Sequence, residues 1–189
     1  MNFIPQSISD VVLIEPTMYG DERGYFIETF RQDLLEKVIG YKVNFVQDNE
    51  SKSTKGVLRG LHYQLNPYTQ AKLVRVIEGS VLDVAVDIRK SSPTFGQYVS
   101  KELSAQNKHQ LFIPQGFAHG FMALTDTATF VYKVDNYYSQ AHERGVCFND
   151  KQLSINWGLP YEILKISEKD RQLPSLDKIE KLFFKKNIT

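Results

Sequence analysis

The chain has 189 residues, 42% of them hydrophobic, with 23 lysines and arginines against 22 aspartates and glutamates. This length suffices for one substantial core, and no Pro-, Gly- or Ser-rich linker divides the chain, so we predict a single domain over residues 1–189. A formal net charge of +1, without long blocks of one sign, gives no support for binding nucleic acid or an anionic membrane.

Targeting signals and cysteine chemistry are also not expected. The first residues, "MNFIPQSISDVV", lack a basic stretch followed by an apolar one, and no run approaches the ~18 apolar residues of a membrane span. We therefore expect a cytoplasmic protein with no membrane partner. A single cysteine, Cys147, excludes an internal disulfide framework and a cysteine-rich metal site, and we interpret it as a small, semi-buried apolar residue.

Short strands dominate the expected elements. A helix is predicted first, at residues 31–40, ending at Gly40. Runs rich in Val, Ile, Phe and Tyr, each bounded by turn residues, then predict strands at residues 43–47, 56–64, 71–79, 80–89, 96–103, 110–114, 119–125 and 129–138. The tail at residues 175–186 is expected to form another helix. This succession predicts an all-β fold, an antiparallel jelly-roll barrel or sandwich with short peripheral helices.

Strand alternation indicates which polar side chains face the barrel interior. Asp83 and Asp87 share one face of their strand, opposite Val84, and Lys72 shares a face with Val74. Both strands are apolar on each face apart from such isolated charges, which suits a sheet covered on both sides. A lone inward charge therefore indicates either a wet strand end or a site.

The stretch "LRGLHYQ", residues 58–64, holds an arginine and a histidine three positions apart. Strict alternation would send Arg59 and His62 to opposite faces of the strand. Gly60 between them permits a bulge that brings both to one face, and we adopt this as a hypothesis.

A metal site is the first chemistry to weigh. The stretch "IPQGFAHGF", which contains His119, has the Pro-x-Gly-x-x-His spacing of the second cupin motif, whose histidine binds a metal. The companion motif would supply a second histidine and a glutamate, but this region offers His62, Gln64, Gln70 and Lys72. Glutamine is a poor ligand, and an inward lysine repels a divalent cation. We expect a cupin-like barrel without a metal, in which His119 is alternatively a hydrogen-bonded histidine beside a turn.

Acid and base chemistry remains. A histidine has an unperturbed pKa of roughly 6.5 and suits a base at neutral pH, which makes His62 a candidate. Tyr132 can act as an acid from the other side of a ligand, and Lys72 can stabilise an enolate oxygen. Taken singly, Tyr132 is more commonly a core aromatic residue and Lys72 a strand-end lysine that reaches solvent.

Eight stretches in order, spread over nearly the whole chain, resemble one enzyme family. They are "DERGYFIETFR", "FVQDNESKS", "GVLRGLHYQ", "QAKLVRVIEGSVLDVAVDIRKSSPTFG", "LFIPQGFAHGF", "YKVDNYY", "HERGVCFND" and "ISEKD". Together they are similar to the dTDP-4-dehydrorhamnose 3,5-epimerase family. The departures are Cys147 and Phe148, where the family more often has an aliphatic residue and a tryptophan, and they concern packing near Glu143.

The resemblance implies an isomerase that uses no cofactor. It would invert C3 and C5 of dTDP-4-dehydro-6-deoxy-D-glucose to give dTDP-4-dehydro-L-rhamnose for a surface polysaccharide, by proton abstraction alpha to the C4 ketone. It also implies a homodimer in which an N-terminal strand joins the partner's sheet. Three alternatives stay open: an epimerase acting at C3 or C5 alone, an epimerase of another nucleotide sugar such as a GDP-heptose, and a non-catalytic cupin that binds a sugar nucleotide.

The resemblance also implies roles for residues. His62 would be the base, Tyr132 the acid and Lys72 the partner of the oxygen at C4, with Asp170 orienting His62. Asp83 is the alternative orienting residue, and a helix cap is the alternative role of Asp170. The implied substrate-binding residues are Arg23, Phe26, Glu28, Gln47, Asp48, Asn49, Arg59, Lys72, His119, Tyr138, Glu143 and Lys169. Among these, Arg23, Arg59 and Lys169 would meet the diphosphate or sugar, and Tyr138 would stack on thymine.

Overall fold

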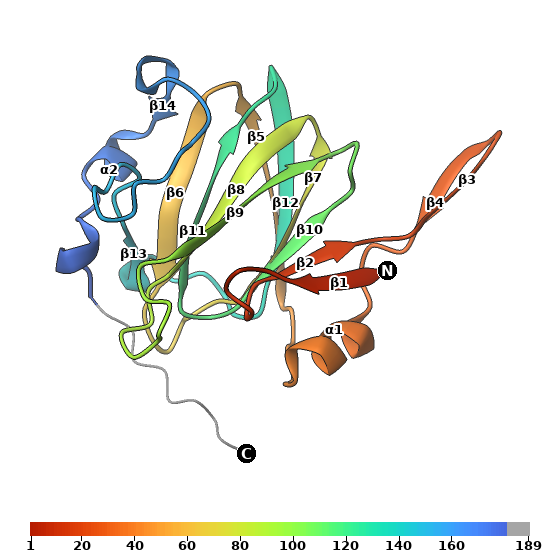
Figure 1. Ribbon diagram of the computed structural model, residues 1–189, viewed down its shortest axis with the longest axis horizontal. Coiled ribbons are helices and arrows are strands. Elements are labelled where there is room, and N and C mark those ends of the chain that lie inside the picture. Colours follow the sequence, from red (N-terminus) through yellow and green to blue (C-terminus); the bar gives the residue numbers. More distant parts are fainter. Residues whose placement is uncertain (181–189) are drawn as a thin grey trace.

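The computed structural model describes residues 1–180 and consists of two facing antiparallel sheets with short helices at the periphery (Figure 1). The first sheet contains, in spatial order, β1 (Asn2–Pro5), β2 (Val12–Glu15), β10 (Gln110–Ile113), β7 (Lys72–Glu78), β12 (Thr127–Val134) and β5 (Gln47–Thr54). The second contains β13 (Glu143–Gly145), β6 (Val57–Gln64), β11 (Phe117–Ala123), β8 (Ser80–Asp87) and β9 (Tyr98–Ser104). The predicted all-β jelly-roll architecture is confirmed.

Smaller elements surround the two sheets. β14 (Lys165–Ile166) pairs in parallel with β6, and β3 (Met18–Asp21) pairs with β4 (Gly24–Ile27) in a separate hairpin. The helices are α1 (Gln32–Ile39), α2 (Glu168–Arg171) and the short 3-10 helices Gln140–His142, Tyr161–Ile163 and Leu176–Lys178. Within residues 1–180, no helix is long and apolar enough to cross a membrane.

The core between the sheets is apolar at its centre. Val74 and Val76 of β7 meet Phe130 of β12, whose ring stacks on Phe121 of β11 at a centroid distance of 4.1 Å. The predicted alternation is confirmed, because Leu73 packs in a different cluster on the outer face of the first sheet. Buried polar side chains, among them Asp83 of β8 and His119 of β11, interrupt this apolar interior.

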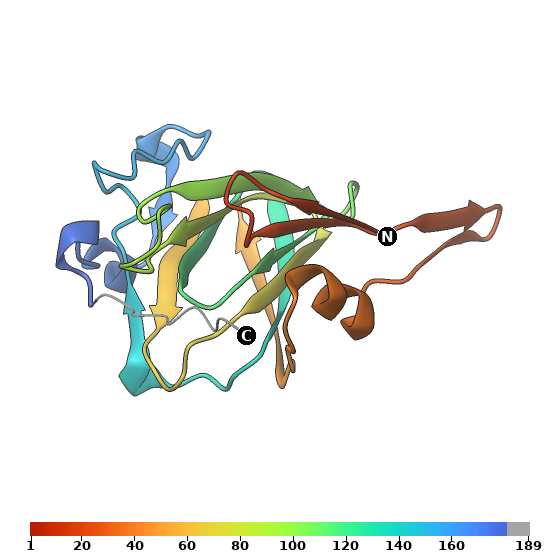
Figure 2. The same ribbon diagram turned by 60° about the horizontal axis from the view of Figure 1, so that its bottom comes forward.

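Both sheets are also covered on their outer faces, as the apolar strands predict. Leu35 of α1 packs against the outer face of the first sheet. Phe148, Trp157 and Leu176, from the segment that follows β13, pack on the outer face of the second sheet. Figures 1 and 2 show this C-terminal segment on the opposite side of the molecule from α1.

Most of the expected elements are confirmed, with ends shifted by a few residues. α1 ends where predicted, at Gly40 in the left-handed conformation with φ 81°. The strand expected at residues 43–47 is wrong, because the polar segment Gln47–Thr54 forms β5 instead. The helix expected at residues 175–186 is replaced by the 3-10 helix Leu176–Lys178, and residues 181–186 lie outside the described residues.

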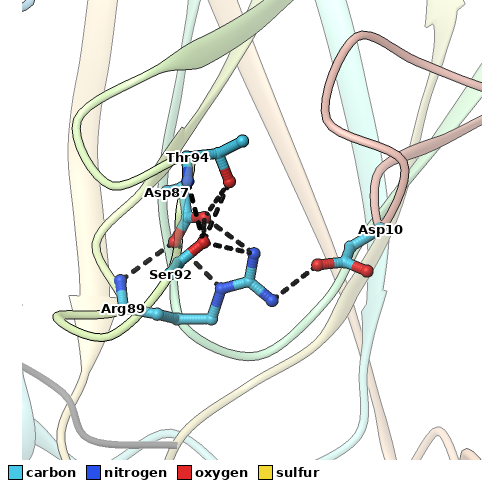
Figure 3. A network of polar contacts seen from close by, with 5 residues as sticks. All are labelled: Asp10, Asp87, Arg89, Ser92 and Thr94. Carbon is cyan, nitrogen blue, oxygen red and sulfur yellow. Dashed lines mark hydrogen bonds and ion pairs between the residues drawn. The ribbon is translucent and has the colours of Figure 1, made fainter. Parts of the chain in front are cut away.

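A polar network around the buried Asp87 carboxylate joins the two sheets at one end (Figure 3). Asp87, at the end of β8, accepts hydrogen bonds from the side chains of Arg89, Ser92 and Thr94. The Arg89 guanidinium also donates to Asp10, in the turn between β1 and β2, at 2.6 Å. The loop between β8 and β9 is thereby tied to the first sheet.

Candidate active site

A cavity of about 250 Å³ is lined by polar side chains from both sheets. The first sheet supplies Lys72 and Tyr132, and the second supplies His62 and Glu143. The remaining lining residues are Gln47, Asn49, Tyr63, Gln64, Gln70 and Tyr138. The predicted base therefore lies on the wall that faces the predicted acid and lysine.

Arg59 and His62 lie on the same face of β6. His62 pairs with His119, and Arg59 pairs with Phe121. Arg59 and His62 are three residues apart on β6, whereas their partners on β11 are only two residues apart. The register shift falls at Gly60, which has φ 128° and lies so close to β11 that a Cβ there would be 2.6 Å from a backbone atom. The hypothesis that Gly60 brings both side chains to one face is confirmed, and only glycine fits this position.

His62 and Asp170 form a close pair. The distance from His62 Nε2 to Asp170 Oδ1 is 2.7 Å, and Asp170 Oδ2 accepts from the Gly60 backbone N–H at 3.2 Å. Burial would raise the pKa of Asp170, but these hydrogen bonds hold it below its usual value. Asp170 does not cap α2, because the Ser167 hydroxyl has that role. Asp83, the alternative partner, contacts His119 instead.

This pairing sets the tautomer of His62. An ionised carboxylate accepts hydrogen bonds only, so Nε2 carries the proton that is donated to Asp170. Nδ1 is then left with its lone pair as the basic nitrogen. The His62 side chain is 28% exposed, which gives it access to the cavity and to solvent.

Lys72 and Tyr132 lie side by side on the opposite wall, with Lys72 Nζ 6.0 Å from the Tyr132 ring centroid. Burial lowers the pKa of Lys72 to about 8, against the opposing effect of Asp83 and Glu143. Burial also raises the pKa of Tyr132, as does Glu143, although Arg59 opposes this. At neutral pH the wall therefore presents a cation and a protonated phenol.

Tyr138, Glu143 and Lys169 meet at the edge of the cavity. Glu143 Oε2 accepts hydrogen bonds from the Tyr138 hydroxyl at 2.7 Å and from Lys169 Nζ at 2.5 Å. Burial would raise the pKa of Glu143, but the contacts with Lys169 and Tyr138 lower it overall. These three residues were predicted to bind substrate, and the structure brings them together.

Gln64 and Gln70 have a structural role that the sequence did not reveal. Gln64 donates to the Tyr68 carbonyl at 3.1 Å and accepts from the Ser139 N–H at 2.7 Å. Gln70 donates to the Asn136 carbonyl at 2.8 Å. The two amides thus hold the backbone on both sides of Tyr138. A buried glutamine in an apolar strand was the feature that could have indicated this.

β5 divides the predicted residues between its two faces. Gln47 and Asn49 line the cavity, and Gln47 donates to Asn49 at 2.8 Å. Asp48 faces the other way and forms an ion pair with Lys133 at 2.9 Å. Arg59 is exposed and donates to Ser53 at 3.1 Å. The structure therefore does not bring Asp48 to the cavity.

Arg23, Phe26 and Glu28 also lie away from the cavity of their own chain. Arg23 and Phe26 belong to the hairpin of β3 and β4, which extends away from both sheets (Figures 1 and 2). Arg23 pairs with Asp21, and the Phe26 side chain is largely exposed. Glu28 lies 3.8 Å from Arg31.

Among residues 1–180, no group of three His, Cys, Asp or Glu side chains is placed to hold a metal ion. His119, the histidine of the cupin-like motif, has Asp83 at 2.9 Å from Nε2 and Lys72 Nζ at 3.5 Å from Nδ1. Both ring nitrogens are therefore already engaged by protein side chains.

Known proteins resemble this chain over nearly its whole length. A family model described as dTDP-4-dehydrorhamnose 3,5-epimerase matches residues 5–178. The dTDP-4-dehydrorhamnose 3,5-epimerase of Shigella flexneri is 59% identical over 170 residues, which are 90% of this chain and 93% of the relative.

Solved structures agree with this similarity. The dTDP-6-deoxy-D-glucose-3,5-epimerase from Legionella pneumophila Philadelphia 1, in complex with dTDP-4-keto-L-rhamnose, superposes with a TM-score of 0.92 at 47% identity. That comparison covers 97% of this chain and 98% of the other. A 3'-monoepimerase from Streptomyces bikiniensis in complex with dTDP-quinovose has a TM-score of 0.84 at 34% identity, covering 92% of this chain and 87% of that one.

Proposed function

Since the chain belongs to the dTDP-4-dehydrorhamnose 3,5-epimerase family, we propose that it inverts C3 and C5 of dTDP-4-dehydro-6-deoxy-D-glucose. The product is dTDP-4-dehydro-L-rhamnose, which is made in the cytoplasm as a precursor for surface polysaccharide. One observation carries the proposal: the pair of His62 and Asp170 faces Lys72 and Tyr132 across one cavity. Inversion needs a base on one side of the sugar and an acid on the other.

The base step starts at His62. Nδ1 removes the proton on C3 or C5, which is acidic because the C4 ketone lies next to it. The resulting imidazolium is stabilised by the Asp170 carboxylate, as in other dyads where a carboxylate orients a histidine. Asp170 is well suited to this, because its pKa is held below the usual value and it stays ionised.

The intermediate is an enolate with its negative charge on the oxygen at C4. Lys72 supplies a cation to this oxygen from the opposite sheet. The cavity excludes much of the solvent around Lys72, which strengthens this interaction.

Tyr132 completes the inversion. Its phenol donates a proton to the carbon from the face opposite His62, and its raised pKa keeps it protonated at neutral pH. Each inversion leaves an imidazolium and a phenolate. Proton exchange with solvent, to which His62 is partly exposed, returns both groups to their starting states.

The nucleotide is held at the edge of the cavity. Arg59 lies on the same face of β6 as His62 and offers a planar fork for a phosphate oxygen. Tyr138 stacks on the thymine ring, Lys169 meets the diphosphate or sugar, and Glu143 is a further substrate-binding residue beside them. The substrate displaces the present contacts among these three residues.

A homodimer is part of the proposal. Arg23 and Phe26 lie on a hairpin that extends away from its own sheets, so a second copy provides the cavity that they reach (Figure 1). The free edge of β1, at the margin of the first sheet, is the place where an N-terminal strand joins a partner's sheet. Light scattering of the purified chain gives its mass in solution and tests this arrangement.

The experiment for the reaction is hydrogen exchange. The protein is incubated with dTDP-4-keto-6-deoxyglucose in deuterated water, and NMR follows deuterium at C3 and C5. We expect incorporation at both carbons together with formation of the L-rhamno product. Incorporation at one carbon would replace the proposal with a single-site epimerase, an activity found in the Streptomyces bikiniensis structural relative. No incorporation, with binding retained, would leave a binding protein.

A further inference from the structure

A row of three charged or titratable side chains, of which Asp83 and His119 are buried, runs from behind the cavity to its wall. Asp83 of β8 lies on the inner face of the second sheet and is 0% exposed. Its Oδ2 lies 2.9 Å from His119 Nε2, and His119 Nδ1 lies 3.5 Å from Lys72 Nζ. The row thus crosses from the second sheet to the first and ends at the cation that faces the cavity.

The protonation state of His119 follows from its neighbours. An ammonium group has no lone pair, so Nδ1 must accept a hydrogen bond from Lys72, which leaves the ring proton on Nε2 for Asp83. Burial and the Lys72 charge lower the pKa of His119, against the effect of Asp83, and this keeps the ring neutral. His119 then connects the Asp83 carboxylate to the Lys72 amino group through its two ring nitrogens.

Asp83 supplies the negative charge that Lys72 otherwise lacks on this side. Within the described residues, Asp83 Oδ1 has no hydrogen-bond donor, although the atom is buried. A buried carboxylate without full hydrogen bonding is costly, and a nearby cation is what offsets that cost. The amino group and the carboxylate therefore stabilise each other across the imidazole.

We propose that Asp83, acting through His119, is a positioning residue that holds Lys72 in its charged form and aims it at the cavity. This inference rests on the proposed function in so far as it gives Lys72 an enolate oxygen to stabilise. It assigns Asp83 to the lysine side of the cavity, whereas the sequence suggested it for His62. It also makes His119 a bridge within the protein.

The charged groups around Lys72 decide its titration. Asp83 on β8 and Glu143 on β13 raise its pKa, and burial lowers it to about 8. His119 on β11 and the Tyr132 ring on β12 also face it, and His62 on β6 lies near His119. Loss of Asp83 removes the first of the two anions that raise the pKa of Lys72, so that pKa must fall further.

The test measures the titration of Lys72 directly in the free protein. Lysine is labelled with ¹³C at Cε, and the Lys72 signal is identified by its absence in Lys72→Arg. In Asp83→Asn we expect the pKa of Lys72 to fall by about one unit or more, the usual effect of removing a nearby opposite charge. The alkaline limb of the kcat profile should move to lower pH by a similar amount, with a smaller change in KM.

Asp150→Asn is the matched control. Asp150 is also buried, but it accepts from the backbone N–H groups of Leu153 and Leu176 and does not line the cavity. This variant should lower thermal stability without moving the Lys72 titration. Asp83→Ala provides a second variant that removes the same charge if Asp83→Asn does not fold.

The outcomes separate this inference from the proposed function. A lowered pKa of Lys72 in Asp83→Asn, together with wild-type protein that exchanges neither C3 nor C5, supports the role of Asp83 and rejects the epimerase. Normal epimerisation with an unchanged Lys72 titration in a folded Asp83 variant overturns the role of Asp83 alone.

Discussion

At the scale of single residues, the proposed proton acceptor and the proposed proton donor line one cavity from different sheets. His62 is oriented by Asp170 at 2.7 Å, and Tyr132 keeps its proton because burial raises its pKa. Lys72, with a pKa of about 8, is mostly charged at pH 7 and loses its proton as the pH rises through that value. The rate should therefore decline on the alkaline side.

Tyr132→Phe tests the assignment of the acid. The variant keeps the ring but has no proton to donate, so net inversion should fall by about 100-fold or more, in the range of general-acid effects. Deuterium exchange at C3 should fall less, because His62 can still remove the proton and return a deuteron from the same side. NMR of the sugar follows both rates in one sample.

Tyr161→Phe serves as the control, since this tyrosine is exposed and stacks on Phe148, outside the cavity. It should behave as the wild type does. Equal losses of exchange and inversion in Tyr132→Phe would mean that Tyr132 acts before the proton leaves, and the assignment would fail.

At the scale of elements, apolar periodicity predicted the central strands and the helix α1, but it missed β5. The inward side chains of β5, which include Gln47, Asn49 and Ser53, line a polar cavity or contact Arg59, so the strand shows no apolar alternation. Strand alternation explains why Asp48 does not reach the cavity. Gln47, Asp48 and Asn49 were all predicted to bind substrate, but alternation along β5 sends the middle side chain to the opposite face.

The residues of the site were partly predictable from the sequence, but their contacts were not. The family resemblance suggested His62, Lys72, Tyr132 and Asp170 as catalytic residues, and the structure places them around one cavity or in contact with a residue that lines it. It could not reveal which histidine Asp83 contacts, because that depends on how two sheets face each other. Contacts between strands distant in sequence are set by packing and not by local pattern.

Substitutions in the network of Figure 3 test how the loop between β8 and β9 is tied to the first sheet. Arg89→Ala leaves the buried Asp87 carboxylate without its ionic partner, and such a change costs about 3–5 kcal/mol. Asp10→Asn removes a half-exposed partner of the same guanidinium and should cost below about 1 kcal/mol. Urea unfolding measures both free energies.

The stabilisation that this network provides should depend on pH. Burial would raise the pKa of Asp87, but hydrogen bonds from Arg89, Ser92 and Thr94 lower it overall. The ionised Asp87 carboxylate therefore stabilises the fold at neutral pH, and this contribution is lost as the pH falls through the lowered pKa of Asp87. Equal costs for Arg89→Ala and Asp10→Asn would contradict a role for the buried pair.

At the scale of the whole molecule, the position of the β3–β4 hairpin argues for a site shared between two copies. Arg23 and Phe26 were predicted to bind substrate, yet their hairpin extends away from both sheets (Figure 1). In a symmetric dimer, each hairpin can reach the cavity of the other chain. The substrate would then contact both chains.

Mixing two defective variants tests this sharing. His62→Ala and Arg23→Ala should each be impaired alone. A mixed dimer has one cavity with an intact His62 that receives an intact Arg23 from its partner, so activity should return after the two variants are unfolded and refolded together. His62→Ala mixed with Asp170→Asn is the control, because both residues belong to one chain's cavity and no complete site can form. No recovery in the first mixture would place Arg23 outside the partner's site.

The central claim is that His62 removes the protons from both carbons, and deuterium exchange in wild-type protein and in His62→Ala tests it most directly. Wild-type protein should incorporate deuterium at C3 and C5 of dTDP-4-keto-6-deoxyglucose. His62→Ala should incorporate it at neither carbon while still binding the nucleotide sugar. Exchange at the wild-type rate in His62→Ala, at either carbon, would contradict the account.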